Sequence, residues 1–348
     1  MRWDGAMGMR KDALSEGSPA RPVSMADVAT AAGVSQQTVS RVVNGKPNVS
    51  EATRERVRKA IEKLGFRPSF AGRALREGQY HTVGVCTFDI SMTGNLATLN
   101  GVVSAAREQG YAVTMIDMGL EDKEPYSVAR ATQRLAELPV DGAIINLNIL
   151  PDDFETYTPL PGLETVLVTM YAHPRCTTVD SDQYGCSLLA MEHLFSLGHT
   201  EIRFVGGPTY HSHSAFREAG WYDELLKRGI APARPLHGDW SATSGYELGL
   251  RLAEDRAMTA VYVANDQMAA GVIAALRERG LRVPEDVSVI GVDDSLDEYV
   301  PNNGLTTIRF DNLERGRIAF SRAINGGTPA AIRVAGQLIE RSTCAPRA

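Results

Sequence analysis

The sequence predicts a small all-α domain followed by a larger α/β core built on parallel sheets. Three observations support this fold class. Residues 21–80 carry 11 lysines and arginines against 5 acidic residues, whereas residues 81–348 carry 22 against 34. Residues 22–66 show only helical patterns, and from His81 onward apolar strand-like runs alternate with helical stretches that stop at glycine. The net charge of −6 therefore combines a basic module with an acidic body.

The composition of the 348-residue chain is that of an ordinary globular protein, with 43% hydrophobic and 22% charged residues. We expect only residues 1–21 to be a disordered leader. No apolar run approaches the roughly 20 residues of a membrane-spanning helix, and the N-terminus lacks the apolar segment of a signal peptide. The four cysteines form no CxxC pair, so we expect reduced thiols in a cytoplasmic protein rather than disulfides or a zinc site.

The basic module begins with two short helices joined by a tight turn. Ser24 and Asp27 form a capping box at the start of a helix over Met25–Ala32. A three-residue break that contains glycine follows, and Ser35 then caps a second helix over about Gln36–Asn44. Two helices joined in this way form a helix-turn-helix, whose second helix enters the major groove of DNA.

One face of the second helix carries side chains that can recognise bases. Gln37 and Arg41 are four residues apart and share this face, with Gln36 beside them. The opposite face is an apolar stripe of Val39, Val42 and Val43. Arginine can contact guanine in a bidentate manner, and glutamine can pair with adenine. Each residue alone also fits a solvated helix, but the combination of caps, turn and polar face favours DNA recognition.

A third helix and a linker complete the module. Ser50 caps a helix over about Glu51–Leu64, whose apolar side chains close a three-helix core. Arg54, Arg58 and Lys59 occupy the rest of its surface, where solvation is the simpler explanation for each. Residues 67–79 contain one proline and two glycines, which predicts a linker.

The stretch VSMADVATAAGVSQQTVSRVVNGKPNVSEATRERVRKAIEKLGFRPS resembles the DNA-binding headpiece of the LacI/GalR (lac repressor) family. The rest of the chain resembles the effector-binding core of the same family, so that the likeness covers about residues 23–345. The resemblance implies a periplasmic-binding-protein-like core, 81–348, of two doubly wound parallel-sheet lobes. The N-lobe would comprise about 81–180 and 309–336, and the C-lobe about 181–308 and 337–345. The helix-turn-helix domain would be 22–66, and a hinge would occupy 67–80.

The resemblance also implies roles in DNA binding. Gln36, Gln37 and Arg41 match base-contacting positions. Five residues match positions near phosphates: Ser35, Thr38, Ser40, Asn44 and Thr53. The linker resembles a hinge helix in which Leu75 would enter the minor groove, with Arg73 nearby and Gly72 in place of the usual alanine. A flexible tether is the alternative for this segment.

In the core, polar residues follow the apolar runs at the strand ends where α/β proteins bind ligands. The strand in AVYVAND ends at Asn265 and Asp266, and the strand in VSVIGVDD ends at Asp293 and Asp294. RFVGGP leads into a loop before Arg217. Trp240 lies in a turn-like segment. Arginine, asparagine and aspartate together can hold vicinal hydroxyls, and an indole can stack on a sugar ring. These residues therefore predict a carbohydrate pocket.

The same residues could also have other roles, such as metal binding, catalysis or packing. Asp293 and Asp294 could form a metal or catalytic pair, but no histidine or glutamate with ligand spacing is near, and Asp294 fits a helix cap. Arg217 could be a surface cation, and Trp240 could belong to the core. His211 and His213 could bind metal, although a solvated loop is the simpler interpretation. FVGGP is no phosphate-binding loop, so we expect no metal, no cofactor and no catalytic site.

By the resemblance, Arg217, Asn265 and Asp293 match sugar-hydroxyl positions, Trp240 matches a stacking position, and Asp180 lies near the crevice between the lobes. The pocket wall of the N-lobe is matched by Phe88, Asp89, Met92, Gly94 and Asn95.

Three residues depart from the lac-type pattern. Thr169 stands where lac-type chains carry an acidic ligand residue, and Phe310 and Asn312 replace the glutamine and phenylalanine of a crossover segment. Phe310 is still expected in the effector pocket. A galactoside-like or other small glycoside is thus the expected effector.

We therefore expect a cytoplasmic, sugar-responsive transcriptional regulator, with repression as the main prediction and either sign of effector control open. The chain stops soon after ERSTCAP, without the extra helix that makes some relatives tetramers, so a homodimer on a palindromic operator is expected. A solute-binding protein without a regulatory role is the alternative. A sugar-metabolising enzyme would need a nucleophile, a base or a cofactor, for which the sequence offers no constellation.

Overall fold

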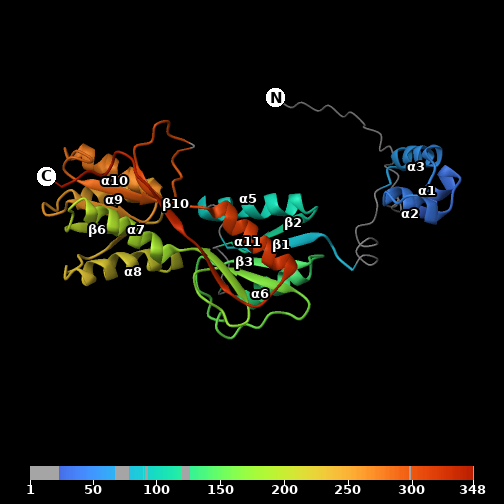
Figure 1. Cartoon of the computed structure of the whole chain (residues 1–348), viewed down its shortest axis with the longest axis horizontal. Helices are drawn as coiled ribbons and strands as arrows, with labels where there is room; N and C mark the ends of the chain where they lie inside the picture. Colours follow the sequence, from blue (N-terminus) through green and yellow to red (C-terminus); the bar gives the residue numbers. More distant parts are fainter. Residues whose placement is uncertain are drawn as a thin grey trace, which may run out of the picture. The chain divides into compact units, whose positions relative to one another are not determined.

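The computed structural model separates the chain into two compact units, residues 1–78 and 79–348 (Figure 1). The structure describes residues 23–66, 78–88, 90, 93–119, 126–297 and 299–347. The predicted hinge residues Gly72, Arg73 and Leu75, the predicted pocket residues Asp89 and Met92, and the predicted leader 1–21 lie outside these ranges.

The first unit contains three helices: α1 (Met25–Ala32), α2 (Gln36–Val43) and α3 (Glu51–Leu64). Each helix begins at a serine whose hydroxyl oxygen accepts a backbone N–H of the first turn: Ser24, Ser35 and Ser50. The capping box between Ser24 and Asp27 is present, as predicted. The three helices pack on a core centred on Val28, Val39 and Val57, which have no exposed surface. These helices confirm the predicted helix-turn-helix.

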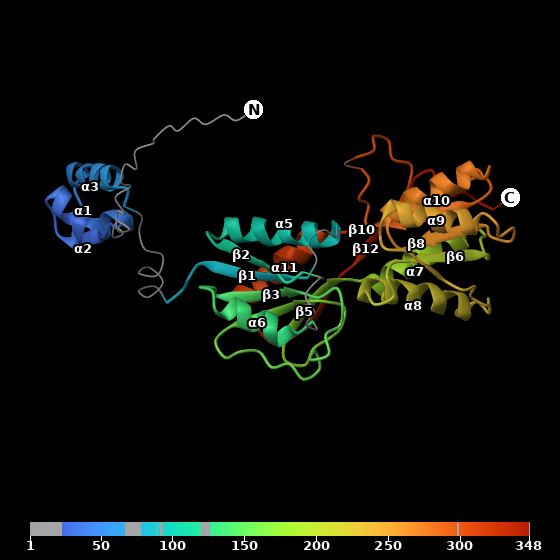
Figure 2. The same ribbon diagram turned by 180° about the vertical axis from the view of Figure 1, so that it is seen from behind.

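The N-lobe of the second unit contains a six-stranded parallel sheet in the order β11-β5-β4-β3-β1-β2. Its strands are β1 (Thr82–Thr87), β2 (Ala112–Asp117), β3 (Gly142–Asn146), β4 (Glu164–Val168), β5 (Thr177–Ser181) and β11 (Ala331–Val334). Helices α5 (Thr93–Glu108) and α11 (Asn312–Asn325) cover one face, and α6 (Val128–Ala136) covers the other (Figure 2).

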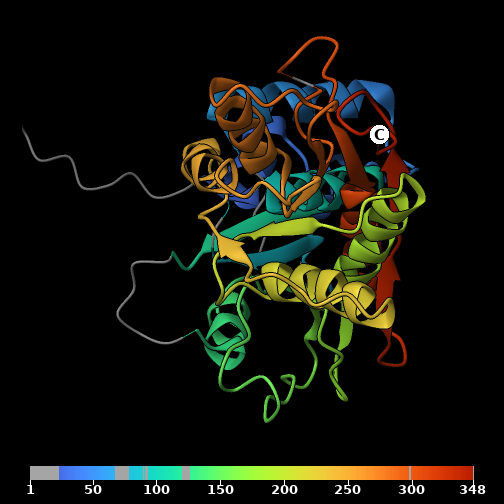
Figure 3. The same ribbon diagram turned by 90° about the vertical axis from the view of Figure 1, so that its left-hand side faces the viewer.

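The C-lobe contains a second six-stranded sheet in the order β12-β10-β9-β8-β6-β7. Its strands are β6 (Ile202–Gly206), β7 (Leu236–His237), β8 (Ala260–Val263), β9 (Ser288–Val292), β10 (Thr306–Phe310) and β12 (Gly336–Ile339). Its helices are α7 (Gln183–Ser196), α8 (Ser212–Lys227), α9 (Ala242–Leu252) and α10 (Asp266–Glu278). Viewed from the C-lobe side, the yellow α8 and the orange α10 lie on opposite faces of this sheet (Figure 3).

The two doubly wound lobes confirm the predicted fold class, with two corrections. Strand β12 pairs antiparallel with β10, so the second sheet is not purely parallel. The apolar runs that predict strands are 82–86, 111–116, 141–147, 164–170, 201–206, 259–264 and 286–292. Five strands lie outside them: β5, β7, β10, β11 and β12. Strands β5 and β10, TTVDS and TTIRF, are interrupted by polar residues that hide them from an apolar-run search. Within the described ranges, no helix is long and apolar enough to cross a membrane.

The chain passes between the two sheets three times. It leaves the N-lobe sheet at Ser181, returns after Phe310 and leaves again after Val334. Residues that directly follow β5 and β10 therefore lie between the lobes, where the carboxyl ends of strands are the usual ligand-binding edge of such sheets.

Helices α5 and α11 approach each other closely because glycine occupies both sides of their contact. A Cβ atom on Gly316 would lie 2.1 Å from the carbonyl oxygen of Thr98, and one on Gly101 would lie 2.1 Å from that of Leu313. Neither position can accept a side chain unless the helices separate.

We expect Gly316→Ala to lower the free energy of unfolding of the core by about 1–3 kcal/mol, because the added methyl group must displace the backbone of α5. Chemical denaturation measures this change. Arg107→Ala, at an exposed position of α5, serves as the control and should stay within about 0.5 kcal/mol of the wild type. Equal stability of the two variants would show that the helices can separate freely.

Candidate functional site

Helix α2 presents the predicted base-reading side chains to solvent. Gln36, Gln37 and Arg41 are all exposed, whereas Val39 on the opposite face is completely buried. The helix is thus oriented within its unit so that its polar face is free for a partner. Donors and acceptors of these kinds match the base edges of the major groove.

The predicted phosphate-contacting residues lie around the same helix, and several already organise it. The hydroxyl of Ser35 lies 3.0 Å from that of Thr38, and the amide of Asn44 donates to the carbonyl of Ser40 at 2.6 Å. Thr53 accepts a hydrogen bond from Ser50 at the start of α3. These bonds fix the ends of α2 and α3, where backbone N–H groups and hydroxyls can meet phosphate oxygens.

In the second unit, a cavity of about 300 Å³ opens between the two lobes. Seven of the residues predicted to form the pocket line it: Gly94, Asn95, Arg217, Trp240, Asn265, Asp293 and Phe310. Phe88 does not line it, because it is buried in the N-lobe core against Tyr126. Asp180 lies behind the wall of the cavity and is almost completely buried.

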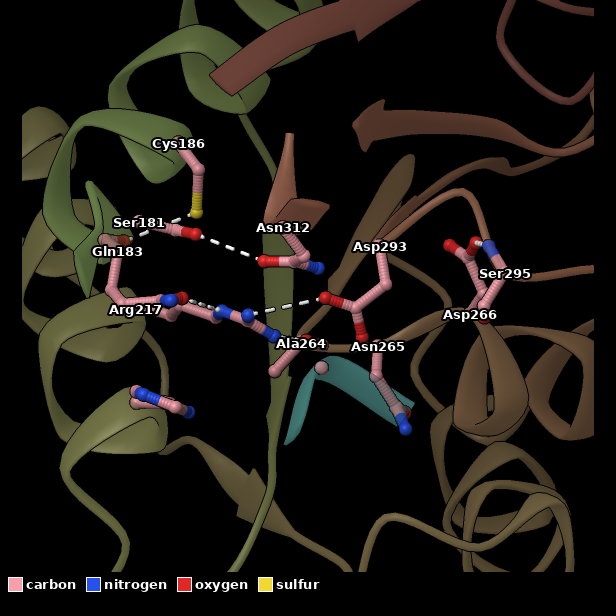
Figure 4. Close-up of polar contacts among 12 residues, drawn as sticks. Ser181, Gln183, Cys186, Arg217, Ala264, Asn265, Asp266, Asp293, Ser295 and Asn312 are labelled. Atoms are coloured by element: carbon pink, nitrogen blue, oxygen red, sulfur yellow. Dashed lines mark hydrogen bonds and ion pairs between the residues drawn. The ribbon is translucent and has the colours of Figure 1, made fainter. Parts of the chain in front are cut away.

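Arg217 is the centre of the cavity wall (Figure 4). Its Nε donates to Oε1 of Gln183 at 2.8 Å, and its Nη2 lies 3.3 Å from Oδ1 of Asp293. A further Nη donates to the carbonyl oxygen of Ala264 at the end of β8. Burial raises the pKa of Asp293, and the nearby charge of Arg217 opposes this change. The guanidinium therefore links a crossover segment to two strand ends.

Trp240 closes the cavity on the side of the C-lobe. Its indole N–H donates to Nδ1 of His211 at 2.8 Å, and its carbonyl accepts from the amide of Asn265 at 2.9 Å. A Cβ atom on Gly207 would lie 2.2 Å from the indole ring, which explains the second glycine of FVGGP. Trp240 has a positive φ of 74°, an unusual conformation for a bulky residue. Two hydrogen bonds and the close approach of Gly207 thus hold this aromatic wall in place.

The two histidines differ from the prediction of a solvated loop. His211 is buried and supports Trp240, while His213 lines the cavity with a side chain that is 12% exposed. The burial of His211 and the position of His213 both follow from the position of α8, whose first turn points toward the N-lobe. Among the residues that the structure describes, no group of three histidine, cysteine or acidic side chains could hold a metal ion.

A buried ionic network connects the lobes beside the cavity. Nη1 of Arg315 lies 2.6 Å from Oδ1 of Asp180, and Nε2 of His213 lies 3.2 Å from the other oxygen of the same carboxylate. Burial alone would raise the pKa of Asp180, but the charges of His213 and Arg315 outweigh it and lower the pKa to about 2. Because Asp180 and Arg315 belong to the N-lobe and His213 to the C-lobe, this network crosses the interlobe crevice.

A second buried carboxyl lies behind the strand ends of the C-lobe. Asp266 accepts hydrogen bonds from the hydroxyl of Thr307 at 2.7 Å and from the backbone N–H of Ser295 at 2.8 Å. Burial, and then the nearby carboxylate of Asp293, raise the pKa of Asp266 to about 8. The Asp294 carboxylate is held by Arg309 and Arg341 and does not cap a helix. The two adjacent acids after β9 therefore have different environments.

Sequence reasoning missed several residues of the cavity. Gln183 and Asn312 are the first residues of α7 and α11, directly after the crossovers from β5 and β10. The strand-end rule that found Asn265 and Asp293 would have found them too, had these two polar strands been recognised. Arg315 gave no signal in the sequence, and His213 was considered only as a metal ligand or as part of a solvated loop, because the roles of both depend on tertiary contacts.

The buried charges of the cavity are paired within the protein. Arg217 faces Asp293, and Arg315 faces Asp180. A pocket with paired charges, amide groups and one indole wall suits an uncharged, polar ligand. An exposed helix-turn-helix together with such a two-lobed core defines the class of DNA-binding regulators that respond to a small molecule.

Comparisons with known proteins identify the family. Residues 24–69 match the model of bacterial regulatory proteins of the lacI family, and residues 191–344 match a periplasmic binding protein-like domain. The lactose operon repressor of Escherichia coli K12 is 35% identical over 311 residues, which are 87% of this chain and 84% of the repressor.

Two solved structures agree with this match. A lac repressor dimer bound to operator and the anti-inducer ONPF has a TM-score of 0.79 and 30% identity, over 93% of this chain and all of that chain. A complex of the transcriptional regulator CelR with cellobiose has a TM-score of 0.65 and 26% identity, over 92% of this chain and 99% of that one. The chain belongs to the lacI family of bacterial regulatory proteins, which confirms the predicted family and makes it a DNA-binding transcriptional regulator.

Helix α11 permits a direct comparison of a buried and an exposed ion pair. We expect Arg315→Leu to lower the free energy of unfolding by about 3–5 kcal/mol, because it leaves the buried Asp180 carboxylate without its arginine partner. Arg317 lies on the same helix as Arg315 and forms an exposed pair with Glu108 of α5, so Arg317→Leu should leave the free energy of unfolding nearly unchanged. Chemical denaturation of both variants gives the two values.

The pH dependence provides the second measurement. The lowered pKa of Asp180 means that its ionised form stabilises the fold fully above its ordinary pKa of 3.8, and that this contribution is lost as the pH falls through about 2. The difference in free energy of unfolding between the wild type and Arg315→Leu should therefore become smaller as the pH falls from 3.8 to about 2. A difference that is constant with pH, or equal effects of the two variants, would contradict the assignment of the buried pair.

Proposed function

We propose that this protein is a sequence-specific transcriptional repressor whose affinity for operator DNA is controlled by a small, uncharged carbohydrate bound between the lobes of its core. The observation that carries this proposal is the interlobe cavity, in which Arg217, Asn265 and Asp293 face an indole wall while the buried charges are paired. Names of similar proteins, a lactose operon repressor and a regulator in complex with cellobiose, support a sugar ligand of the glycoside class.

For DNA binding, we assign base contacts to Gln36, Gln37 and Arg41 on the exposed face of α2. Phosphate contacts are assigned to the residues around the ends of α2 and α3: Ser35, Thr38, Ser40, Asn44 and Thr53. The segment 67–80, with Leu75, serves as the hinge that enters the minor groove. The excess of basic residues in 21–80 attracts the phosphate backbone, so binding weakens as the salt concentration rises.

For ligand binding, Arg217, Asn265 and Asp293 hydrogen-bond vicinal hydroxyls, and Trp240 stacks on the sugar ring. Asn95 and Phe310 complete the wall, because both line the same cavity. A sugar that contacts both lobes stabilises one lobe arrangement over others, and the resulting population shift changes operator affinity. Coupling free energies of this kind are about 1–3 kcal/mol.

The assembly follows from the same proposal. A homodimer places two reading helices on a palindromic operator, and the cytoplasm is where the chromosomal DNA lies. The ligand is bound and released without chemical change. Incubation with a bound sugar should leave that sugar intact.

We expect Arg41→Ala to cost about 1–3 kcal/mol of operator binding and to relax discrimination at one base pair, because a bidentate contact to a base edge is lost. Binding to a set of operator variants, measured by fluorescence anisotropy, checks this. Lys63→Ala at the far end of α3 is the control, with discrimination unchanged. A uniform loss of affinity for every DNA sequence would instead identify Arg41 as a phosphate contact.

Asp293→Asn should abolish the effect of the ligand on operator binding while the affinity of the ligand-free protein for DNA stays the same. The substitution removes the charge that pairs with Arg217 and accepts sugar hydroxyls, and it nearly preserves shape. A thermal-shift screen with mono- and disaccharides first identifies the ligand, since saturation at 100 times its Kd adds about 2.7 kcal/mol. Asp297→Asn, at an exposed position outside the cavity, is the control and should respond to the ligand as the wild type does. If operator binding by Asp293→Asn also responds to the ligand as in the wild type, Asp293 does not belong to the pocket.

A further inference from the structure

Three side chains of the cavity wall have no role in the sugar site described above: Gln183, His213 and Asn312. They come from α7, α8 and α11, and two of them directly follow the crossovers between the lobes. Each is fixed by a hydrogen bond to another protein group, so the orientation of its remaining polar atom is determined. We can therefore say which hydrogen-bonding groups this part of the wall offers.

The two amides offer donors. Oε1 of Gln183 accepts from Nε of Arg217 at 2.8 Å, and Oδ1 of Asn312 accepts from the hydroxyl of Ser181 at 3.1 Å. Because both amide oxygens already accept hydrogen bonds within the protein, the amide nitrogens are the groups that can donate to a ligand. Figure 4 shows the nitrogen of Asn312 on the side away from Ser181. Gln183 is almost completely buried, which makes an unsatisfied amide nitrogen there costly.

The histidine offers one ring nitrogen. Nε2 of His213 lies 3.2 Å from a carboxylate oxygen of Asp180, and Arg315 occupies the other oxygen of that group. Because the ionised carboxylate can only accept, Nε2 donates to it, and Nδ1 is the ring nitrogen that remains. Within the described ranges, no other protein group engages Nδ1 of His213 or the amide nitrogens of Gln183 and Asn312.

Two amide donors and one ring nitrogen in the same wall discriminate among ligand groups. An ammonium group would meet the two amide N–H groups. An alkyl or aryl group would leave all three polar atoms without partners, at a cost in affinity for each. A hydroxyl group can both donate and accept, so hydroxyls satisfy all three side chains.

The position of these residues separates them from the first sugar ring. The guanidinium of Arg217 lies between Gln183 on its Nε side and Asp293 on its Nη2 side. Asp293 lies at a strand end of the C-lobe sheet, as do Asn265 and the neighbouring Trp240. Gln183 and Asn312 lie instead at the crossovers, where Ser181 joins the two segments. The cavity therefore has two polar walls with one arginine between them.

We propose that Gln183, His213 and Asn312 form a second subsite that selects glycosides carrying a hydroxyl-rich group beyond the first ring, such as a second sugar, over glycosides with an apolar group there. This inference rests on the proposed function and specifies its ligand class. It also explains why an asparagine, rather than an apolar side chain, occupies position 312.

Isothermal titration calorimetry of the full chain with matched probes tests the subsite. The probes are lactose and cellobiose, each compared with the isopropyl glycoside of the same non-reducing sugar. We expect the wild type to bind at least one disaccharide about tenfold more tightly than its matched isopropyl glycoside. Asn312→Leu should remove this preference by weakening disaccharide binding about tenfold, with the isopropyl glycoside as tightly bound as before.

Two further variants make the outcome decisive. Asn325→Leu introduces the same change at an exposed position of α11 outside the cavity and should preserve the preference. Asn312→Asp keeps the shape and the acceptor for Ser181 but removes the donor, so it should weaken the disaccharide even if Asn312→Leu fails to fold. An equal affinity of the wild type for both members of each pair, or a preference that survives both Asn312 variants, overturns the subsite. If none of the four sugars binds a wild-type protein that still binds DNA, the sugar assignment itself is wrong.

Discussion

The structure of the core depends on the need to satisfy a buried guanidinium. Arg217 lies inside the molecule, where an unpaired charge would be strongly destabilising, and its partners come from a crossover and two strand ends. These partners fix Gln183, Ala264 and Asp293 relative to one another. The same arginine also lies 5.9 Å from the ring centre of Trp240 and 5.8 Å from that of Phe310. A single charge thus orients both the polar and the aromatic sides of the pocket.

The second buried arginine has a complementary role. Arg315 binds Asp180, and it also donates to the hydroxyl of Thr98 at 2.8 Å within α5. It therefore ties helix, sheet and crossover together in the N-lobe, and through His213 this network reaches the C-lobe. Arg217 organises one side of the cavity and Arg315 the other, and the contact of His213 with Asp180 joins the two lobes beside it. A ligand that changes this contact acts on both lobes at once.

The sequence predicts the helices and strands that have strong local signals, and it misses the strands and residues whose positions depend on tertiary contacts. The serine caps placed all three helices of the first unit within one residue, because capping depends only on neighbouring residues. Apolar runs identified the central strands, and their ends led to Asn265 and Asp293. Strands β5 and β10 were not predicted, because threonine and charged residues interrupt them, and the positions of Gln183 and Asn312 in the cavity wall were therefore missed. The buried roles of His211 and His213 depend on Trp240 and Asp180, which are far away in the sequence.

The threefold passage of the chain between the lobes has a consequence for the order of events during synthesis. The N-lobe sheet is completed by β11 at Ala331–Val334, and its core includes Ala319, Phe320 and Ala323 of α11. The C-lobe sheet needs β12, which follows immediately. Both sheets can therefore be completed only once residues 331–339 have been synthesised, whereas the core of the DNA-binding unit needs no residue beyond Phe66.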